Sequence, residues 1–176
     1  KRAGEYAAKY SKENRAPALR PDVVDAAVKK ALAPFDRPQD ATGPYQIQHE
    51  LQNMMQDLVG IVRREDEMVK ALSGVQRLQE RAQQVGVTGN REYNPGWHTA
   101  LDLHNLLTVS EAIARAAIDR KESRGGHFRD DYPDKDPKFA THNTVVAKGP
   151  DGKMQLRREP LPPMPDYLKQ VIEEMK

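Results

Sequence analysis

The sequence predicts a mainly α-helical fold, an antiparallel three-helix bundle similar to a spectrin repeat, with short N-terminal helices before it and a β-hairpin tail after it. Apolar residues recur at steps of three and four across residues 44–121, which is the period of an amphipathic helix. The turn residues Asn94-Pro95-Gly96 separate the last of these stretches from the others. Two short apolar runs flank a glycine-containing turn at residues 148–153, and this pattern predicts the hairpin.

Composition excludes several classes of function. The chain has 176 residues and no cysteine, so it holds no disulfide, no thiolate metal site and no cysteine-ligated iron–sulfur cluster. Acidic and basic residues are interspersed and sum to a formal charge of +2, which gives no basic face for nucleic acid. No apolar run approaches the roughly 20 residues that cross a bilayer, so we expect no direct membrane insertion. The 13 prolines and a mean hydropathy of -0.83 predict extended arms around a compact centre.

Residues 1–43 form the first of three predicted parts. A helical pattern is already under way at Lys1 with no N-cap before it, so the chain looks like a piece of a longer protein. A second short helix is expected over residues 21–32, because Pro21 suits the first turn of a helix. Residues 34–44 contain three prolines and are expected to form a loop or linker that no helix crosses.

Residues 44–121 form the predicted bundle. We expect its first two helices to cover each other, and the third, over residues 97–120, to be central because apolar residues nearly surround it. Residues 60–67 either continue one long helix or form a turn, and Gly86 and Gly89 are expected to end the second helix. The three apolar sets are Ile47, Leu51, Met54, Leu58 and Ile61; Met68, Leu72, Val75, Leu78, Ala82 and Val85; and Leu101, Leu103, Leu106, Leu107, Val109, Ile113 and Ile118.

Residues 122–176 form the third predicted part, a charged turn followed by a hairpin and an extended tail. The hairpin strands are expected over residues 144–147 and 154–157. The proline-rich residues 160–165 are expected to be extended, and residues 167–175 to form a short terminal helix.

The charged turn, residues 122–136, is the main candidate for a functional site. Paired glycines permit backbone conformations closed to other residues, and we expect the two arginines and the histidine to face the aspartates that neutralise them. This composition predicts a buried or half-buried, salt-bridged turn that pins the end of the bundle. The residues assigned to this structural motif are Glu122, Ser123, Arg124, Gly125, Gly126, His127, Arg129, Asp131, Asp134 and Asp136.

Other interpretations of the charged turn are weaker. Its aspartates lack the alternation, central glycine and distal glutamate of a calcium-binding EF-hand, and its glycine pair lacks the preceding strand and following helix of a phosphate-binding loop. His127 and His142 lie in irregular segments beside charged residues, where a general base is possible, but a structural hydrogen-bond role is favoured for both. We therefore predict no catalytic, cofactor-binding or metal-binding residue in this chain.

Motifs along the chain resemble, in order, the C-terminal part of the flavoprotein subunit of succinate dehydrogenase and fumarate reductase. The pattern Glu-Ser-Arg-Gly-x-His-x-Arg-x-Asp-x-Pro-x-x-Asp, which starts here at Glu122, is similar to the turn that follows the last bundle helix in that family. Further similar segments are Arg2-Ala3-Gly4-Glu5-Tyr6-Ala7, Leu51-Gln52-x-Met54-Met55, Met68-x-x-Ala71-Leu72, Leu103-x-Asn105-Leu106-Leu107 and Pro137-Lys138-Phe139.

The resemblance implies a parent oxidoreductase of electron transport and the tricarboxylic acid cycle that binds FAD in an N-terminal domain and exchanges a hydride with a dicarboxylate. The residues that do this work in the family lie upstream of the matched segment, so the piece alone is expected to be inactive and to bind no cofactor. Residues 1–43 would then be the end of the flavin domain and its connection. The implied partners are the remainder of the flavoprotein subunit and the iron–sulfur subunit. The implied location is cytoplasmic, at the inner face of the cytoplasmic membrane through partner subunits.

Three alternatives stay open from the sequence. The same helical domain is found in L-aspartate oxidase-like flavoproteins, so the parent could belong to that branch. The chain could instead be a free-standing helical module that binds a partner helix in a groove, or a catalytic bundle built on His127. The residues after Asp166 depart from some members of the family, and the sequence does not predict what they contact.

Overall fold

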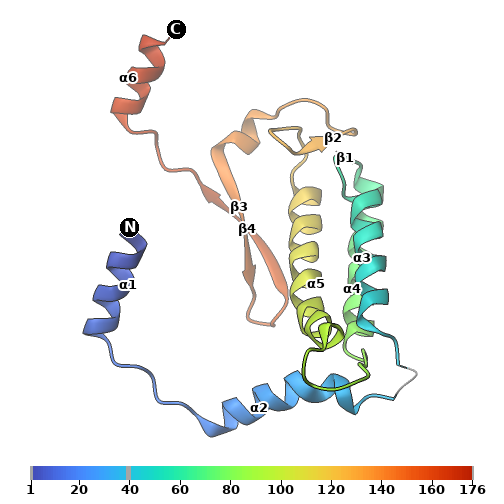
Figure 1. Ribbon diagram of the computed structural model, residues 1–176. Helices are drawn as coiled ribbons and strands as arrows, with labels where there is room; N and C mark the ends of the chain where they lie inside the picture. The colour runs from blue at the N-terminus through green and yellow to red at the C-terminus, as the bar shows by residue number, and fades with distance from the viewer. Residues whose placement is uncertain (1, 39–40, 176) are drawn as a thin grey trace.

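The computed structural model describes residues 2–38 and 41–175, so residues 39–40 of the predicted linker lie outside the described part of the chain. Three helices pack side by side, a β-hairpin lies beside them, and two arms extend away (Figure 1). The mainly helical class with a small hairpin is confirmed. The elements are α1 (Arg2–Glu13), α2 (Pro21–Leu32), η1 (Ala33–Asp36), α3 (Pro44–Leu58), β1 (Val62–Arg63), α4 (Glu65–Ala82), α5 (Pro95–Asp119), β2 (Phe128–Arg129), η2 (Pro137–Thr141), β3 (His142–Lys148), β4 (Met154–Pro160) and α6 (Asp166–Glu174).

The core lies between α3, α4 and α5, which contact one another pairwise. Helices α3 and α5 run in one direction and α4 in the other (Figure 1). Their apolar stripes meet because the residues of each recur every three or four positions, on one face of the helix. The larger buried cluster is Ile47, Leu51, Val75, Leu78, Ala82, Val85, Ala100, Leu103 and Leu107, and a smaller one, of Val59, Met68, Ala71 and Ala117, lies where α5 ends.

The junction between α3 and α4 is a turn rather than a continuous helix. Helix α3 ends at Leu58, and a Cβ at Gly60 would lie 2.5 Å from the carbonyl oxygen of Gln56. Ile61 therefore lies outside the helix and is 81% exposed, so its placement on the first apolar stripe was wrong. The chain instead enters β1, which pairs in parallel with the distant β2. The register sets Val62 opposite Phe128 and Arg63 opposite Arg129.

Helix α4 ends at Ala82, before the two glycines that were expected to end it. Val85 is buried although it lies beyond the helix. Gly86 instead allows the chain after α4 to approach the segment before α3 closely. A Cβ at this position would lie 2.8 Å from the Cβ of Ala41, and the N–H of Gly86 donates to the carbonyl of Thr42 at 3.2 Å. The position of these glycines was thus explained wrongly: they shape the connection after the helix and not the helix end.

Helix α5 begins at Pro95, where the side-chain oxygen of Asn94 accepts a hydrogen bond from the N–H of Trp97 at 3.0 Å. One face of α5 packs into the core. A second apolar face, which led to the prediction of a central helix, is exposed in the described chain. Its residues are Leu106, Val109 and Ile113. The prediction of burial all round was therefore wrong for this face.

The hairpin is longer than the sequence predicted. Strands β3 and β4 pair antiparallel from His142 opposite Pro160 to Lys148 opposite Met154, and Gly152 adopts a positive φ of 79° in the turn between them. The hairpin is attached to the end of α5, since Arg158 Nη2 donates to Asp119 Oδ1 at 3.0 Å.

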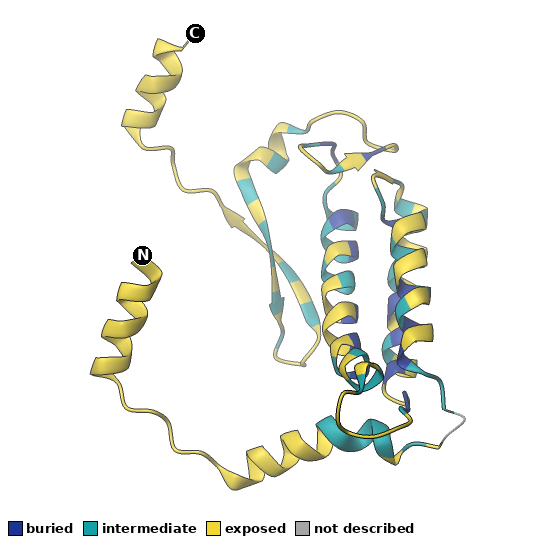
Figure 2. Cartoon of the chain, viewed as in Figure 1, coloured by how far each residue is buried: buried dark blue, intermediate teal, exposed yellow. Residues whose placement is uncertain are grey.

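The two arms are exposed. Neither α1, α2 nor α6 has a buried residue, and Figure 2 shows α1 and α6 exposed along their whole length. The N-terminal arm is fastened to the bundle at the end of α2, where Trp97 Nε1 donates to the carbonyl of Ala31 at 2.7 Å. The segment after it was expected to be a loop, but it contains the 3₁₀ turn η1. None of the described helices is both long enough and apolar enough to span a membrane.

The variant Leu103→Ala tests the core, with Leu106→Ala on the same helix as its control. Leu103 is 0% exposed and Leu106 is 38% exposed. We expect Leu103→Ala to lower the free energy of unfolding by about 2–5 kcal/mol, because it removes buried methyl groups and leaves a cavity, and Leu106→Ala by less than about 1 kcal/mol. Urea denaturation of both variants measures the difference, and equal losses would contradict the assignment of faces.

Candidate functional site

The charged turn starts where α5 ends, and backbone hydrogen bonds close it. The N–H of Ser123 donates to the carbonyl of Asp134 at 3.0 Å. Arg124 and His127 exchange two backbone bonds, of 2.8 and 3.0 Å, across Gly125-Gly126. Gly125 has a φ of 59°, which a glycine adopts without strain. The glycine pair therefore makes a tight reversal of the chain, and not a phosphate-binding loop that opens a helix.

Glu122 is the buried anion of the turn. Its side chain is fully buried and accepts hydrogen bonds from Arg120 Nη1 at 2.7 Å, from Arg124 Nε at 2.8 Å and from the backbone N–H of Asp136 at 2.9 Å. These bonds, that of Arg124 first, lower the pKa of Glu122 from its ordinary value of 4.5 to about 2, although burial acts in the opposite direction. The carboxylate therefore stays ionised and holds three separate segments of the turn together.

Arg129 is the buried cation of the turn and lies at the C-terminal end of α5. Its guanidinium forms a bidentate pair with Asp131, with both bonds 2.7 Å long, and a third bond to Glu65 Oε2 at 3.2 Å. Its Nη1 donates to carbonyls that α5 leaves without helical partners, where a cation also opposes the helix dipole. These are the carbonyls of Ala117, Ile118 and Arg120, at 3.0, 3.4 and 3.3 Å.

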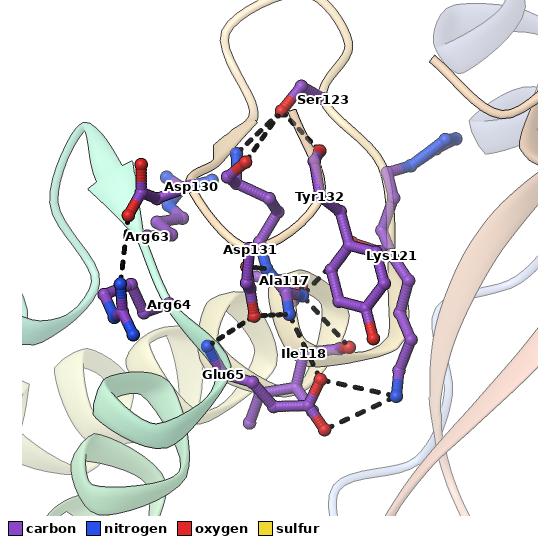
Figure 3. Close-up of polar contacts among 12 residues, drawn as sticks. Arg63, Arg64, Glu65, Ala117, Ile118, Lys121, Ser123, Asp130, Asp131 and Tyr132 are labelled. Atoms are coloured by element: carbon purple, nitrogen blue, oxygen red, sulfur yellow. Dashed lines mark hydrogen bonds and ion pairs between the residues drawn. The ribbon is translucent and has the colours of Figure 1, made fainter. Parts of the chain in front are cut away.

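The same group of residues holds the start of α4 (Figure 3). Asp131 Oδ2 accepts a hydrogen bond from the N–H of Glu65, the first residue of α4, at 3.0 Å, and so caps the helix with a negative charge. Arg64 Nη1 pairs with Asp130 Oδ2 at 3.0 Å, and Lys121 Nζ with Glu65 at 3.3 Å. The bond from Arg129 lowers the pKa of Asp131 far below its usual range, so this carboxylate is ionised. The charged turn thus joins the beginning of one helix to the end of another.

His127 lies between two basic segments. Its Nε2 lies 3.0 Å from the carbonyl oxygen of Arg120, and its Nδ1 lies 2.8 Å from Arg63 Nη1. Since a carbonyl only accepts and a guanidinium only donates, these contacts assign the proton to Nε2. Burial lowers the pKa of His127, and so do the charges of Arg63, Arg129 and Arg120, although the hydrogen bond to the backbone of Arg120 acts in the opposite direction. A neutral histidine in this place links β1 to the end of α5.

The structure pairs the charges of the turn differently from the sequence-based expectation. Arg129 does meet Asp131, but Arg124 pairs with Glu122 and not with an aspartate, and His127 contacts Arg63. The reason is that Glu122 is more deeply buried than any aspartate of the turn and requires two cations.

The remaining predicted residues act mostly through the backbone. Asp134 offers its carbonyl to Ser123, and Asp136 donates its N–H to Glu122 while its side chain accepts from the N–H of Lys138 at 2.9 Å. The sequence-based assignment missed Arg63, Glu65 and Arg120. The charged stretch 60–67 was a signal for the first two, but nothing in the sequence pairs it with a turn so far along the chain.

These contacts define what the site does chemically: they neutralise two buried ions and cap two helix ends. Within residues 2–38 and 41–175, no group of three histidine, aspartate or glutamate side chains is placed to hold a metal ion. The second candidate base, His142, lies against the ring of Phe139 with their centroids 5.7 Å apart. We call the contacts of the charged turn with the start of α4 and the end of α5 the joint.

A groove of about 430 Å³ lies between α2, the end of α4 and the start of α5. Alanines and Pro34 form much of its wall, with Lys30, Arg37 and His104 among the polar lining residues. Burial, and then the charge of Lys30, lower the pKa of His104. The lining comes from helices and from the turn after α4, without the strand–turn–helix unit that holds a dinucleotide, so these residues do not form a dinucleotide site for FAD.

Fold and turn together are those of a helical C-terminal domain of flavoproteins. The family described as "Fumarate reductase flavoprotein C-term" matches residues 48–169, more than half of the chain. The chain belongs to this family, that of the succinate dehydrogenase and fumarate reductase flavoprotein subunits, and the resemblance seen in the motifs is confirmed.

Individual relatives agree with this assignment. The succinate dehydrogenase flavoprotein subunit of Coxiella burnetii is 35% identical over 138 residues, which are 78% of this chain and 23% of that protein. The L-aspartate oxidase of Yersinia pestis is 41% identical over 86 residues, 49% of this chain and 15% of that protein. Mycobacterium smegmatis Sdh1 in complex with UQ1 superimposes with a TM-score of 0.85 and 40% identity over 95% of this chain and 29% of that one. The chain therefore spans less than a third of the length of these relatives.

The variant Arg129→Lys tests the joint. Lysine keeps the charge but cannot bond at once to Asp131, Glu65 and the carbonyls of α5, so we expect the free energy of unfolding to fall by about 3 kcal/mol. The matched control is Arg157→Lys, whose exposed pair with Glu159 should contribute nothing measurable. Chemical denaturation measures both, and a loss no larger for Arg129→Lys than for the control would contradict the assignment.

The variant Glu122→Gln tests the buried anion through pH. The folded state lowers the pKa of Glu122 to about 2, so its contribution to stability is complete above about pH 4.5 and is lost as the pH falls towards 2. We expect the free energy of unfolding of the unmodified chain to decrease over this window, and the variant to be less stable at neutral pH with a shallower dependence. Glu5→Gln, on the exposed α1, is the control and should keep the full slope. An unchanged slope in Glu122→Gln would refute the prediction.

Proposed function

We propose that this chain is the C-terminal helical domain of an FAD-dependent flavoprotein subunit that interconverts succinate and fumarate in electron transport. The observation that carries the proposal is the superposition on Sdh1, which extends over 95% of the chain at 40% identity. The match to L-aspartate oxidase covers only 49% of the chain, and this difference favours the succinate and fumarate branch.

Within the parent protein, the role of the domain is structural. Residues 1–43 connect it to the flavin domain, residues 44–121 form the spectrin-repeat-like bundle, and residues 122–176 form the turn, hairpin and tail. The full pairing of Glu122 and Arg129 supports this role, because both carboxylate oxygens of Glu122 and all three guanidinium nitrogens of Arg129 already have hydrogen-bond partners within the chain. The residues of the groove do not fit FAD, which the remainder of the subunit would bind.

The partners in this proposal are the remainder of the flavoprotein subunit and the iron–sulfur subunit. The exposed apolar residues of the arms support a partner, because such a surface is uncommon on a protein that works alone. Through these partners the domain would lie in the cytoplasm, at the inner face of the cytoplasmic membrane.

The proposal is tested with the full-length gene product and, separately, with the 176-residue chain. We expect the full-length protein to purify with stoichiometric flavin and to reduce an artificial electron acceptor with succinate, and the chain alone to carry no flavin. Stoichiometric flavin on the chain alone would contradict the structural role. L-aspartate is assayed in parallel, and turnover with aspartate in place of succinate would move the parent to the L-aspartate oxidase branch. A full-length product that lacks both a flavin domain and flavin would indicate the free-standing module.

A further inference from the structure

Helix α6, residues Asp166–Glu174, carries an apolar stripe that nothing in the described chain covers. Leu168, Val171 and Ile172, together with Met175 directly after the last helical residue, recur at steps of three, one and three, so they lie on one face of the helix. All four side chains are exposed, by 41–82%. On the opposite face lie polar residues such as Gln170. The helix has the form of an amphipathic ligand for another surface.

The short length of α6 indicates that its apolar face packs against another surface. The helix has only nine residues, and an isolated helix shorter than about 12–15 residues is marginal in water. Most helices of this length are stabilised by packing of their apolar face, and α6 has no buried residue. Its stability therefore depends on a body that the described chain does not contain.

The linker before α6 keeps it away from the bundle. The residues between β4 and α6 include Pro162, Pro163 and Pro165, which favour a stiff, extended conformation. The N–H of Leu161 still bonds to the carbonyl of Thr141 at 2.9 Å, so the linker leaves the hairpin in a fixed position. A stiff linker with one fixed end presents α6 at a defined place rather than at random.

Figure 1 shows that α6 and α1 project to the same side of the hairpin, away from the bundle. The matched family is that of C-terminal domains, so the remainder of a flavoprotein subunit would precede α1 in the chain. The superposition on Sdh1 covers 95% of this chain and so includes most of the open arm formed by α1 and α2. The same superposition covers only 29% of the Sdh1 chain. The body expected next to α1 is therefore the preceding part of the same polypeptide, and α6 extends towards the same side.

We propose that α6 is a docking helix which binds the preceding, flavin-binding part of the same subunit through Leu168, Val171, Ile172 and Met175. This rests on the proposed function, and it adds that the last helix of the chain returns to the domain that comes first. The C-terminal domain would thus be attached to the flavin-binding part at two places. The polypeptide connects them at α1, and α6 connects them by an apolar contact.

Hydrogen exchange of the full-length flavoprotein subunit, purified without its partner subunits, tests the proposal. The α6 amides should be protected, and Ile172→Asp should speed their exchange about ten- to a hundredfold, because a charge then enters the apolar contact. Gln170→Asp adds the same charge to the opposite face and should leave the exchange unchanged. Fast exchange in the unmodified subunit, protection that arises only with the iron–sulfur subunit, or protection that depends on subunit concentration would each overturn the proposal.

A photo-crosslinking residue at Val171 gives a second readout that does not depend on a destabilising variant. We expect crosslinks to residues that precede α1 in the same polypeptide, and crosslinks to another subunit or to a second copy would overturn the proposal. Flavin content and succinate oxidation of the same preparation separate the two proposals. A flavin-containing, active subunit with a freely exchanging α6 refutes the docking alone, whereas a subunit without flavin refutes the proposed function, and the crosslink still reports what α6 contacts.

Discussion

The buried guanidinium of Arg129 is the interaction on which the rest of the bundle end depends. It is fully buried, so without partners its charge would strongly destabilise the fold. Its partners come from three places: Asp131 in the turn itself, Glu65 at the start of α4, and the last carbonyls of α5. Satisfying this one group therefore requires that two helices and the turn be in register. The parallel pairing of β1 with β2 lies beside these contacts, and there the N–H of Asp130 donates to the carbonyl of Arg63 at 2.9 Å.

The turn separates its buried ions instead of pairing them with each other. Glu122 is neutralised by Arg120 and Arg124, and Arg129 by Asp131 and Glu65. Each ion thus has its own set of hydrogen bonds, and neither can lose its charge without losing several of these contacts. This arrangement explains how a segment so rich in charge folds into a closed turn with two buried ions.

Helical periodicity predicted α3, α4 and α5 well, because a one-sided apolar stripe leaves few alternatives. It failed where a local backbone effect ends a stripe, as at Ile61 after Gly60, and where a second apolar face of a helix is exposed in the described chain, as at Leu106 and Val109. The charged turn was recognisable from its composition. Its partners were not, because Glu65 lies 66 positions before Asp131, and no local pattern in the sequence specifies so distant a contact.

That separation has a consequence for synthesis of the protein. Helices α3 and α4 can assemble as they leave the ribosome, since they are neighbours in sequence, whereas β1 keeps an unpaired edge until β2 has been made. The joint at this end of the bundle then closes only after the charged turn has been made, and the hairpin and α6 follow later in the chain. A ribosome that stalls between the two strands exposes the start of α4 to chaperones and proteases for the whole duration of the pause.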